Sequence, residues 1–136
     1  MMNPAYKTII TNENGINGSV TADNGFTVQV APVKGADLEH TNPEQLIGAS
    51  WATCLNATIY SILKLKQLDN KARVRVEVLL FTHEKTGYRF ELHAKAAIEN
   101  MPFDEVKAIV EHADKFCPVS KLVSGRQGVT LEVEAY

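Results

Sequence analysis

The segment of residues 41–68 constrains the fold more than any other part of the sequence, because it predicts one long helix that is apolar on nearly every face. Asn42 is a good N-cap, Pro43 suits the first helical position, and Glu44 favours the positive end of the helix dipole. Gln45 can return a side-chain hydrogen bond to the cap. No later proline interrupts the segment, so about 24 residues can continue as one helix of about 36 Å.

A helix that is apolar on all sides is either buried in protein or spans a membrane. Polar residues interrupt this helix at several positions, which favours burial in protein over a membrane span. These residues are Glu44, Gln45, Asn56, Thr58, Ser61 and Lys64. One face of a sheet cannot cover such a helix completely, so we predict that a second subunit supplies the rest, most simply in a two-fold homodimer. A thiol, Cys54, lies in the middle of the helix.

Alternating apolar and polar residues predict strands on both sides of this helix. The strands are expected at residues 6–11, 16–22, 26–31, 73–81, 88–99 and 129–133. The first three predict an antiparallel meander, and the next two predict a second antiparallel hairpin. Residues 102–116 predict an amphipathic helix, and residues 120–123 a short helical turn. The order β-β-β-α-β-β-α-(α)-β predicts an α+β fold and not a doubly wound α/β fold.

Length and composition indicate one ordinary globular domain over residues 1–136, with 45% apolar and 22% charged residues. The net charge of −2 and the lack of a dense basic patch give no attraction to nucleic acid or to an anionic membrane. Residues 1–10 lack a basic segment followed by a long apolar run, so we expect no signal peptide. Two cysteines without an export signal predict a cytoplasmic protein with reduced thiols.

Each cysteine has an ordinary structural explanation, because a free cysteine is often a small buried hydrophobe. Cys54 and Cys117 lie too far apart in the sequence for a Cys-x-x-Cys redox or zinc motif. Cys117 precedes Pro118 at the end of a predicted helix, where the helix dipole disfavours a thiolate, so it is the weaker candidate for an attacking thiol. The neighbours of Cys54, Thr53 and Asn56, supply no charge that would help it to ionise. These patterns do not decide whether the two thiols meet.

Three short segments resemble the OsmC/Ohr superfamily of osmotically inducible and organic hydroperoxide resistance proteins. They are TNPEQL at residues 41–46, ATCL at residues 52–55 and CPVS at residues 117–120. The resemblance covers nearly the whole chain and is that of a divergent OsmC-like member. It implies an intertwined α+β homodimer with two active sites at the subunit interface.

The chemistry implied by the resemblance assigns Cys54 as the peroxidatic thiol and Cys117 as the resolving thiol. Cys54 would attack an organic hydroperoxide and become a sulfenic acid, which Cys117 would convert into an intramolecular disulfide. A small dithiol, of lipoyl type in the best-known members, would then reduce that disulfide by exchange. This chemistry needs no metal and no other cofactor. An apolar pocket would favour alkyl or fatty-acyl hydroperoxides over hydrogen peroxide.

Glu44 matches the active-site carboxylate of the family, although it is equally explained as a first-turn partner of the helix dipole. On an ideal helix Glu44 lies about 15 Å from Cys54, so a shared site requires a bend or the other subunit. The family arginine of the N-terminal hairpin is missing, because Ile16 occupies the aligned position. Loss of that cation is expected to raise the pKa of Cys54 and slow its attack, at ~1.4 kcal/mol per pKa unit. Cations that could replace it are Lys7, Lys34, Arg73 and Arg126.

Two other functions stay open at this point. The missing arginine favours a thiol redox sensor or slow scavenger, in which oxidation of the two cysteines changes stability or partners. The apolar interface pocket would instead suit a non-catalytic module that binds a small ligand. Trp51 is expected in the core or the dimer interface. The four histidines show no paired ligand spacing and are expected to be structural or solvated; they are His40, His83, His93 and His112.

Overall fold

The computed structural model describes residues 2–35 and 37–136, and the chain divides into two compact units, Met1–Leu46 and Ile47–Tyr136. The boundary falls within a single helix, α1 (Pro43–Leu65), so this helix contributes residues to both units. The expectation of one domain over the whole chain therefore stays a prediction. The order of elements in the two units is the predicted one.

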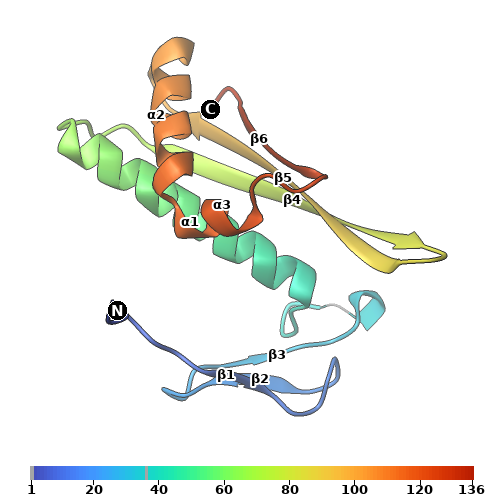
Figure 1. Ribbon diagram of the computed structural model, residues 1–136. Helices are drawn as coiled ribbons and strands as arrows, with labels where there is room; N and C mark the ends of the chain where they lie inside the picture. The colour runs from blue at the N-terminus through green and yellow to red at the C-terminus, as the bar shows by residue number, and fades with distance from the viewer. Residues whose placement is uncertain (1, 36) are drawn as a thin grey trace. The chain divides into compact units, whose positions relative to one another are not determined.

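The N-terminal unit contains a small antiparallel sheet of three short strands in the order β1-β2-β3 (Figure 1). The strands are β1 (Ile10–Asn12), β2 (Ser19–Ala22) and β3 (Thr27–Gln29). The predicted meander is thus confirmed, with strands shorter than the alternation of residues suggested. The turn after β1 is held by Asn12, whose Oδ1 accepts a hydrogen bond from the N–H of Gly15 at 2.7 Å. The predicted loop before α1 contains a short 3₁₀ helix, η1 (Val33–Gly35).

The start of α1 is the part of this unit that local sequence determines most directly. The side-chain Oδ1 of Asn42 accepts a hydrogen bond from the backbone N–H of Gln45 at 2.8 Å, which confirms the predicted N-cap. The reciprocal half of the capping box does not form. The Oε1 of Gln45 instead accepts a hydrogen bond from the hydroxyl of Thr41 at 2.9 Å, so its side chain is already occupied.

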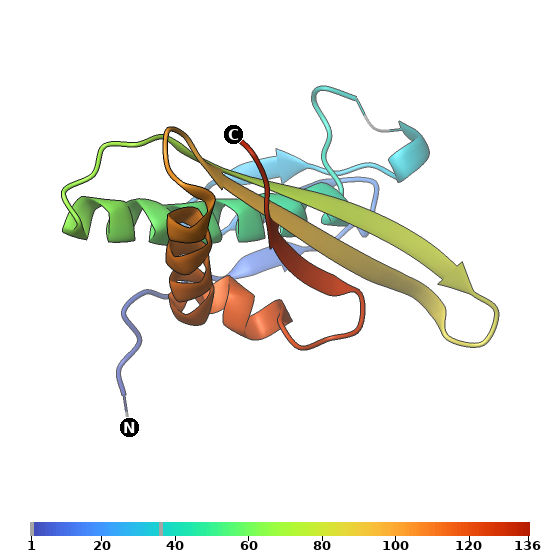
Figure 2. The same ribbon diagram turned by 90° about the horizontal axis from the view of Figure 1, so that it is seen from above.

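The C-terminal unit is built on a second sheet in the order β4-β5-β6. Strands β4 (Ala72–His83) and β5 (Gly87–Ile98) form the predicted antiparallel hairpin, and β6 (Val129–Val133) pairs with β5 in parallel. Parallel neighbours require a crossover connection, here α2 (Phe103–Phe116) followed by α3 (Pro118–Val123). Figure 2 shows β6 beside β5, with α2 and α3 between them along the chain. The crossover explains why both helices lie between the last two strands in the sequence.

The core of this unit joins α1, α2 and one face of the sheet. The helix α1 contributes one buried side chain per turn, and β5 contributes every second residue, as the alternation predicts. The buried set includes Trp51, Leu55, Ile59, Leu63, Leu92, Ala94, Ala96, Ile98, Val106, Ile109, Val110 and Ala113. Leu80, Phe103 and Phe116 are apolar residues of β4 and α2 that stay exposed. The two phenylalanines stand at the ends of α2, and Leu80 lies in the distal part of the hairpin, which extends past the helices (Figure 1).

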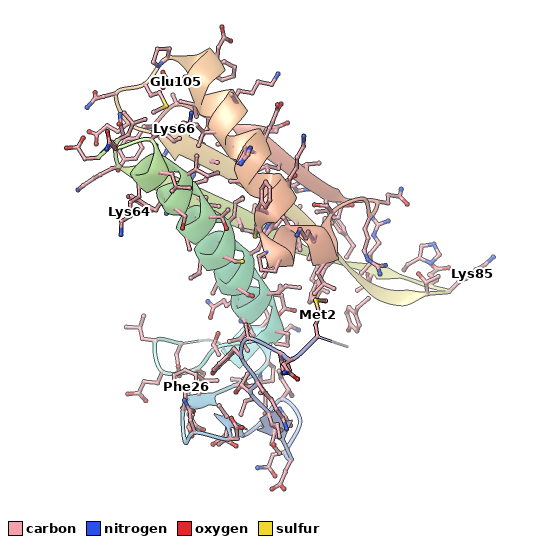
Figure 3. The ribbon with its side chains drawn as sticks, turned by 60° about the vertical axis from the view of Figure 1, so that its left-hand side comes forward. Met2, Phe26, Lys64, Lys66, Lys85 and Glu105 are labelled. Atoms are coloured by element: carbon pink, nitrogen blue, oxygen red, sulfur yellow. The ribbon has the colours of Figure 1, made fainter. Side chains whose placement is uncertain are left out.

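Much of α1 stays uncovered within one chain. Only 28% of its most apolar 18-residue window is buried, and Leu65 at its end is 85% exposed. Among the described residues, α1 is the one helix long and apolar enough to cross a membrane, a property that core helices of soluble proteins share. Figure 3 shows Lys64 and Lys66 projecting at its C-terminal end, and Lys85 at the tip of the β4–β5 hairpin. The expected second subunit would cover the faces that this chain leaves open.

Candidate active site

Cys54 lies in the middle of α1 and is half-buried. It follows the buried Trp51 by three residues, so the two side chains occupy neighbouring positions on one side of the helix. Its backbone carbonyl accepts a hydrogen bond from the hydroxyl of Thr58 at 2.9 Å, one turn further along. The regular backbone of α1 therefore places this thiol at the margin of the core.

Cys117 is the single residue that connects α2 to α3, and it is completely buried. Its backbone N–H donates to the carbonyl of Ala113 at 2.8 Å and ends α2. Its carbonyl accepts from the N–H of Lys121 at 3.0 Å and begins α3, in which Pro118 occupies the first turn. Its Sγ accepts a hydrogen bond from the backbone N–H of Ser120 at 3.3 Å.

This position corrects the expectation that the sulfur of Cys117 faces the negative end of a helix dipole. The residue does follow the last turn of α2, but its side chain turns towards the first turn of α3 as an N-cap. Free N–H groups and a positive partial charge lie at that end of a helix. The correction arises because Cys-Pro-x-Ser starts a new helix at once, with Pro118 at a position where its missing N–H costs nothing.

The two thiols are neighbours although they come from different elements, and both are free. Burial is the largest cause that raises the pKa of Cys54 above its ordinary value. The Cys117 thiol raises this pKa further, whereas a hydrogen bond from the backbone N–H of Val119 lowers it. The first turn of α3 thus directs one backbone amide to each sulfur, Val119 to Cys54 and Ser120 to Cys117.

Burial, one backbone amide and the second thiol are the causes that shift the pKa of Cys54, and none of these causes is a cation. Arg73, one candidate for the missing family arginine, lies 3.5 Å from the carboxylate of Glu134 and stacks on the ring of Tyr136. Arg75 binds the same carboxylate through its Nε at 2.8 Å. Arg126 is exposed in the turn after α3. Within residues 47–136, no cation is therefore among the causes that shift the pKa of Cys54.

Glu44 belongs to the N-terminal unit and lies in the first turn of α1. Its Oε2 is buried and has no hydrogen-bond partner among the residues that the structure describes. A buried carboxylate oxygen without a donor is unfavourable, since it loses its contacts with water. The position agrees with the expected first-turn location, and its role in a site stays a prediction.

One contact near the thiols was not predicted from the sequence. The indole Nε1–H of Trp51 donates a hydrogen bond to the hydroxyl of Ser120 at 2.8 Å, in the interior of the unit. Trp51 was expected in the core or the dimer interface and lies in the core, but its partner Ser120 was not predicted. The sequence does show a serine three residues after Cys117, near the start of a helix. Local sequence patterns cannot connect this serine to a tryptophan 69 positions earlier.

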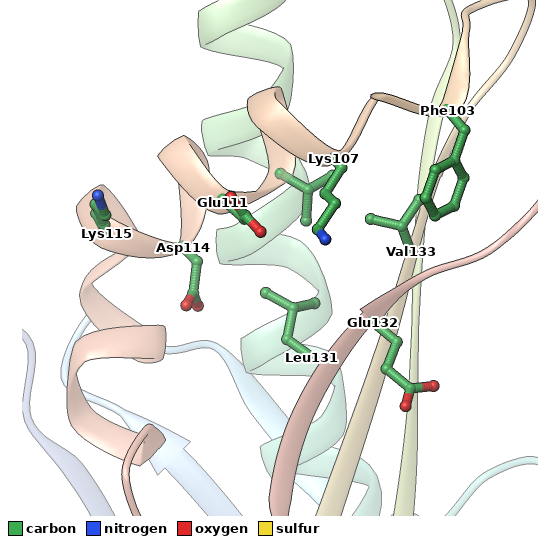
Figure 4. A pocket seen from close by; sticks show the side chains of 9 residues that line it. Phe103, Lys107, Glu111, Asp114, Lys115, Leu131, Glu132 and Val133 are labelled. Carbon is green, nitrogen blue, oxygen red and sulfur yellow. The ribbon is translucent and has the colours of Figure 1, made fainter. Parts of the chain in front are cut away.

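A separate cavity of about 540 Å³ lies between α2 and β6 (Figure 4). Its walls include Phe103, Leu131 and Val133 on the apolar side, and Lys107 and Glu111 on the charged side. Neither cysteine lines this cavity. Within residues 2–35 and 37–136, no cluster of three histidine, cysteine or acidic side chains could hold a metal ion.

Comparison with known proteins places this geometry in a family. A family model described as OsmC-like protein matches residues 35–134, and the chain belongs to this family. It is 32% identical to the organic hydroperoxide resistance protein-like 2 of Staphylococcus epidermidis, over 99% of both chains.

Solved structures agree with this assignment. An organic hydroperoxide resistance protein from Elizabethkingia anophelis matches with a TM-score of 0.87 and 27% identity, over 99% of this chain and 100% of the other. An organic hydroperoxide resistance protein OsmC from Legionella pneumophila matches with a TM-score of 0.86 and 27% identity, over 97% and 99%. These matches confirm the α+β, OsmC-like fold predicted from the sequence.

Proposed function

We propose that this protein is a cysteine-based thiol peroxidase that reduces organic hydroperoxides. The observation that carries the proposal is the meeting of two free thiols, one from α1 and one from the junction of α2 and α3. The relatives support the same reaction class, because they are named organic hydroperoxide resistance proteins. In the proposed reaction the chain uses its own two sulfurs and needs no metal or other cofactor.

Cys54 is the attacking thiol in this proposal, because it is the more exposed of the two. Its thiolate attacks the distal oxygen of the hydroperoxide, the O–O bond breaks, and the alcohol leaves after taking up a proton. The sulfur is thereby oxidised to a sulfenic acid. Cys117 then attacks this sulfur, forms the disulfide and releases water. A small dithiol restores both thiols by two exchange steps and leaves as its own disulfide.

The amides of α3 support the roles of the two sulfurs. The N–H of Val119 stabilises negative charge on Cys54, which partly offsets the effect of burial on its pKa. The N–H of Ser120 holds Cys117 Sγ in place beside Cys54. Glu44 is proposed as the carboxylate of the site, because its buried Oε2 has no donor among the described residues. A cation from a second subunit would supply that donor.

We further infer that the working form is a homodimer. The uncovered apolar faces of α1 support this inference, since a helix that stays exposed on several apolar sides is not stable in water alone. Exposed apolar side chains of the N-terminal unit also need cover, among them Ile10 in β1 and Phe26 just before β3. Analytical ultracentrifugation should give a dimer at micromolar concentration, and a monomer would contradict the inference.

A thiol redox sensor or slow scavenger is the second candidate. It is favoured by the raised pKa of Cys54, which lowers the fraction of thiolate at neutral pH. A sensor would form the disulfide with peroxide but would turn over negligibly with a dithiol. A non-catalytic ligand-binding module, the third possibility, would keep its function when both cysteines are replaced.

Stopped-flow fluorescence of the single tryptophan tests the proposal directly, because Trp51 lies one turn from Cys54. Wild-type protein mixed with cumene hydroperoxide should show a rapid change, followed by steady consumption of peroxide when dihydrolipoamide is present. Cys54→Ser should abolish both. Cys117→Ser should react once and stop at the sulfenic acid, which dimedone traps. Equal peroxide consumption by Cys54→Ser and wild type would exclude the assignment.

A further inference from the structure

A buried hydrogen bond joins the two elements that carry the cysteines. The indole Nε1–H of Trp51 on α1 donates to the hydroxyl of Ser120 on α3 at 2.8 Å. Trp51 is 1% exposed and Ser120 is 0% exposed, so the bond is shielded from water at both ends. Either group alone in this apolar interior would be unsatisfied, and each therefore depends on the other. The bond holds α3 at one defined place along α1.

This bond lies one helical turn from each thiol. Trp51 precedes Cys54 by three residues, a spacing that puts both on one side of α1. Ser120 follows Cys117 by the same spacing, and its backbone N–H donates to Cys117 Sγ at 3.3 Å. Ser120 therefore has two contacts at once, the indole through its side chain and the sulfur through its backbone.

The amide of Val119, between Pro118 and Ser120, lowers the pKa of Cys54, so the same turn acts on the other thiol. Both amides belong to the same short turn, so a shift of that turn would weaken both contacts with sulfur together. Disulfide formation requires the two sulfurs to approach in one geometry. A misplacement of 1 Å can reduce the rate of such a step by about a hundredfold.

We propose that Trp51 and Ser120 are positioning residues for the thiol pair, whose hydrogen bond fixes the first turn of α3 so that Cys117 faces Cys54 within bonding reach. This inference rests on the proposed function, because it gives the two residues a task in disulfide formation. A purely structural bond would stabilise the core and leave the joining of the thiols unaffected. The two roles therefore differ in the equilibrium between dithiol and disulfide.

The test measures that equilibrium for wild type, Trp51→Phe and Ser120→Ala in mixtures of oxidised and reduced dithiothreitol. The exchange is balanced, since the two protein thiols pass two electrons and two protons to the cyclic disulfide, which opens to a dithiol. Alkylation with a heavy maleimide and electrophoresis give the oxidised fraction. We expect each variant to form its disulfide about tenfold less favourably than wild type. Ser120→Thr keeps the hydroxyl and should restore most of the loss.

Ile59→Val is the matched control, because Ile59 lies in the same buried stripe of α1 and the change removes one methylene. Its disulfide equilibrium should stay within about twofold of wild type. The double variant of Trp51→Phe and Ser120→Ala should lose no more than the larger single loss, because one bond is removed in every case. A loss in Ile59→Val as large as in Ser120→Ala, or fully additive losses in the double variant, would overturn the proposal.

The two proposals fail in different measurements. Peroxide takes no part in the dithiothreitol equilibrium, so slow consumption of cumene hydroperoxide by wild type counts only against the peroxidase. Wild-type equilibria in both Trp51→Phe and Ser120→Ala count only against the positioning role. Should Trp51→Phe fail to fold, the difference between Ser120→Ala and Ser120→Thr decides, and an equal loss in these two overturns the inference.

Discussion

The two sheets of this chain have similar alternating sequences and very different surroundings. In the sheet β4-β5-β6, the inward residues of β5 are buried beneath two helices of the same unit. In the sheet β1-β2-β3, Ile10 is 60% exposed and all three strands are short. The sheet β4-β5-β6 is part of a hydrophobic core, whereas the sheet β1-β2-β3 has an exposed apolar side chain.

This difference shows what alternation of residue types can and cannot specify. The period of two defines which face of a strand is apolar, but burial depends on what packs against that face. The C-terminal unit supplies its own cover through α1 and α2. The exposed Ile10 of the N-terminal sheet shows that an apolar strand residue stays open to solvent where nothing in the described part of the chain packs against it. Substitutions of apolar residues should therefore reduce stability strongly where other elements bury the side chain, and only weakly where the side chain is exposed. Stability measurements on matched variants can test this contrast.

Leu55→Ala should produce the largest loss, about 3–5 kcal/mol in the free energy of unfolding, because it opens a cavity in a completely buried part of α1. Leu65 is exposed at the end of the same helix within one chain, so in a monomer Leu65→Ala should change stability by about 0.5 kcal/mol or less. Urea unfolding at one fixed protein concentration measures both. A comparable loss at Leu65 would mean that a partner covers this end of α1.

Gly128→Ala should have the next effect, about 1–3 kcal/mol, because this residue has a positive φ of 85° and no room for a Cβ. An added Cβ would lie 2.7 Å from Cγ of Glu91. Gly87→Ala is the control, with a φ of 77° and nothing within 4 Å of the new atom. Thermal unfolding of the two variants separates the cost of the backbone from the cost of crowding. Equal losses would show that Glu91 moves aside freely.

Asn42→Ala should cost about 1 kcal/mol, since it removes the acceptor for the Gln45 N–H at the start of α1. This is the largest effect that we expect from a polar side chain in the N-terminal unit. Asn42→Asp keeps the acceptor and should remain close to wild type. Chemical denaturation of the pair, with circular dichroism as the signal, checks the prediction. A similar loss in Asn42→Asp would argue against the capping role.

The pH dependence of stability should show the smallest difference between wild type and Cys54→Ser. Burial raises the folded-state pKa of Cys54, so the folded protein holds this proton more tightly than the unfolded chain. The associated stability is fully present below the unfolded pKa, about 8.5, and is lost as pH rises through the higher folded value. Unfolding from pH 7 to pH 10 should therefore show a steeper decline for wild type. Parallel curves for the two proteins would contradict this cause.

The order of elements, the Asn42 cap and the buried stripe of α1 could be predicted from sequence, because each depends on residues close together in the chain. The parallel pairing of β6 with β5 could not, since alternation carries no information about strand direction. The sequence analysis also missed that Cys117 is both the C-cap of α2 and the N-cap of α3. The two helices share this one residue as their boundary, and the sequence pattern indicated only the end of the first helix. The sequence pattern left the meeting of the two cysteines undecided, and tertiary packing through Trp51 and Ser120 brings the elements together.

The junction at Cys117 has a consequence for spectroscopy. Since its sulfur accepts the N–H of Ser120, any change at that sulfur alters the electronic surroundings of one backbone nitrogen in the interior. Should the proposed disulfide form, the ¹⁵N–¹H cross-peak of Ser120 is expected to move, and slow exchange would give separate peaks for the two states. In the proposed redox cycle, this amide would serve as an internal reporter that requires no attached dye.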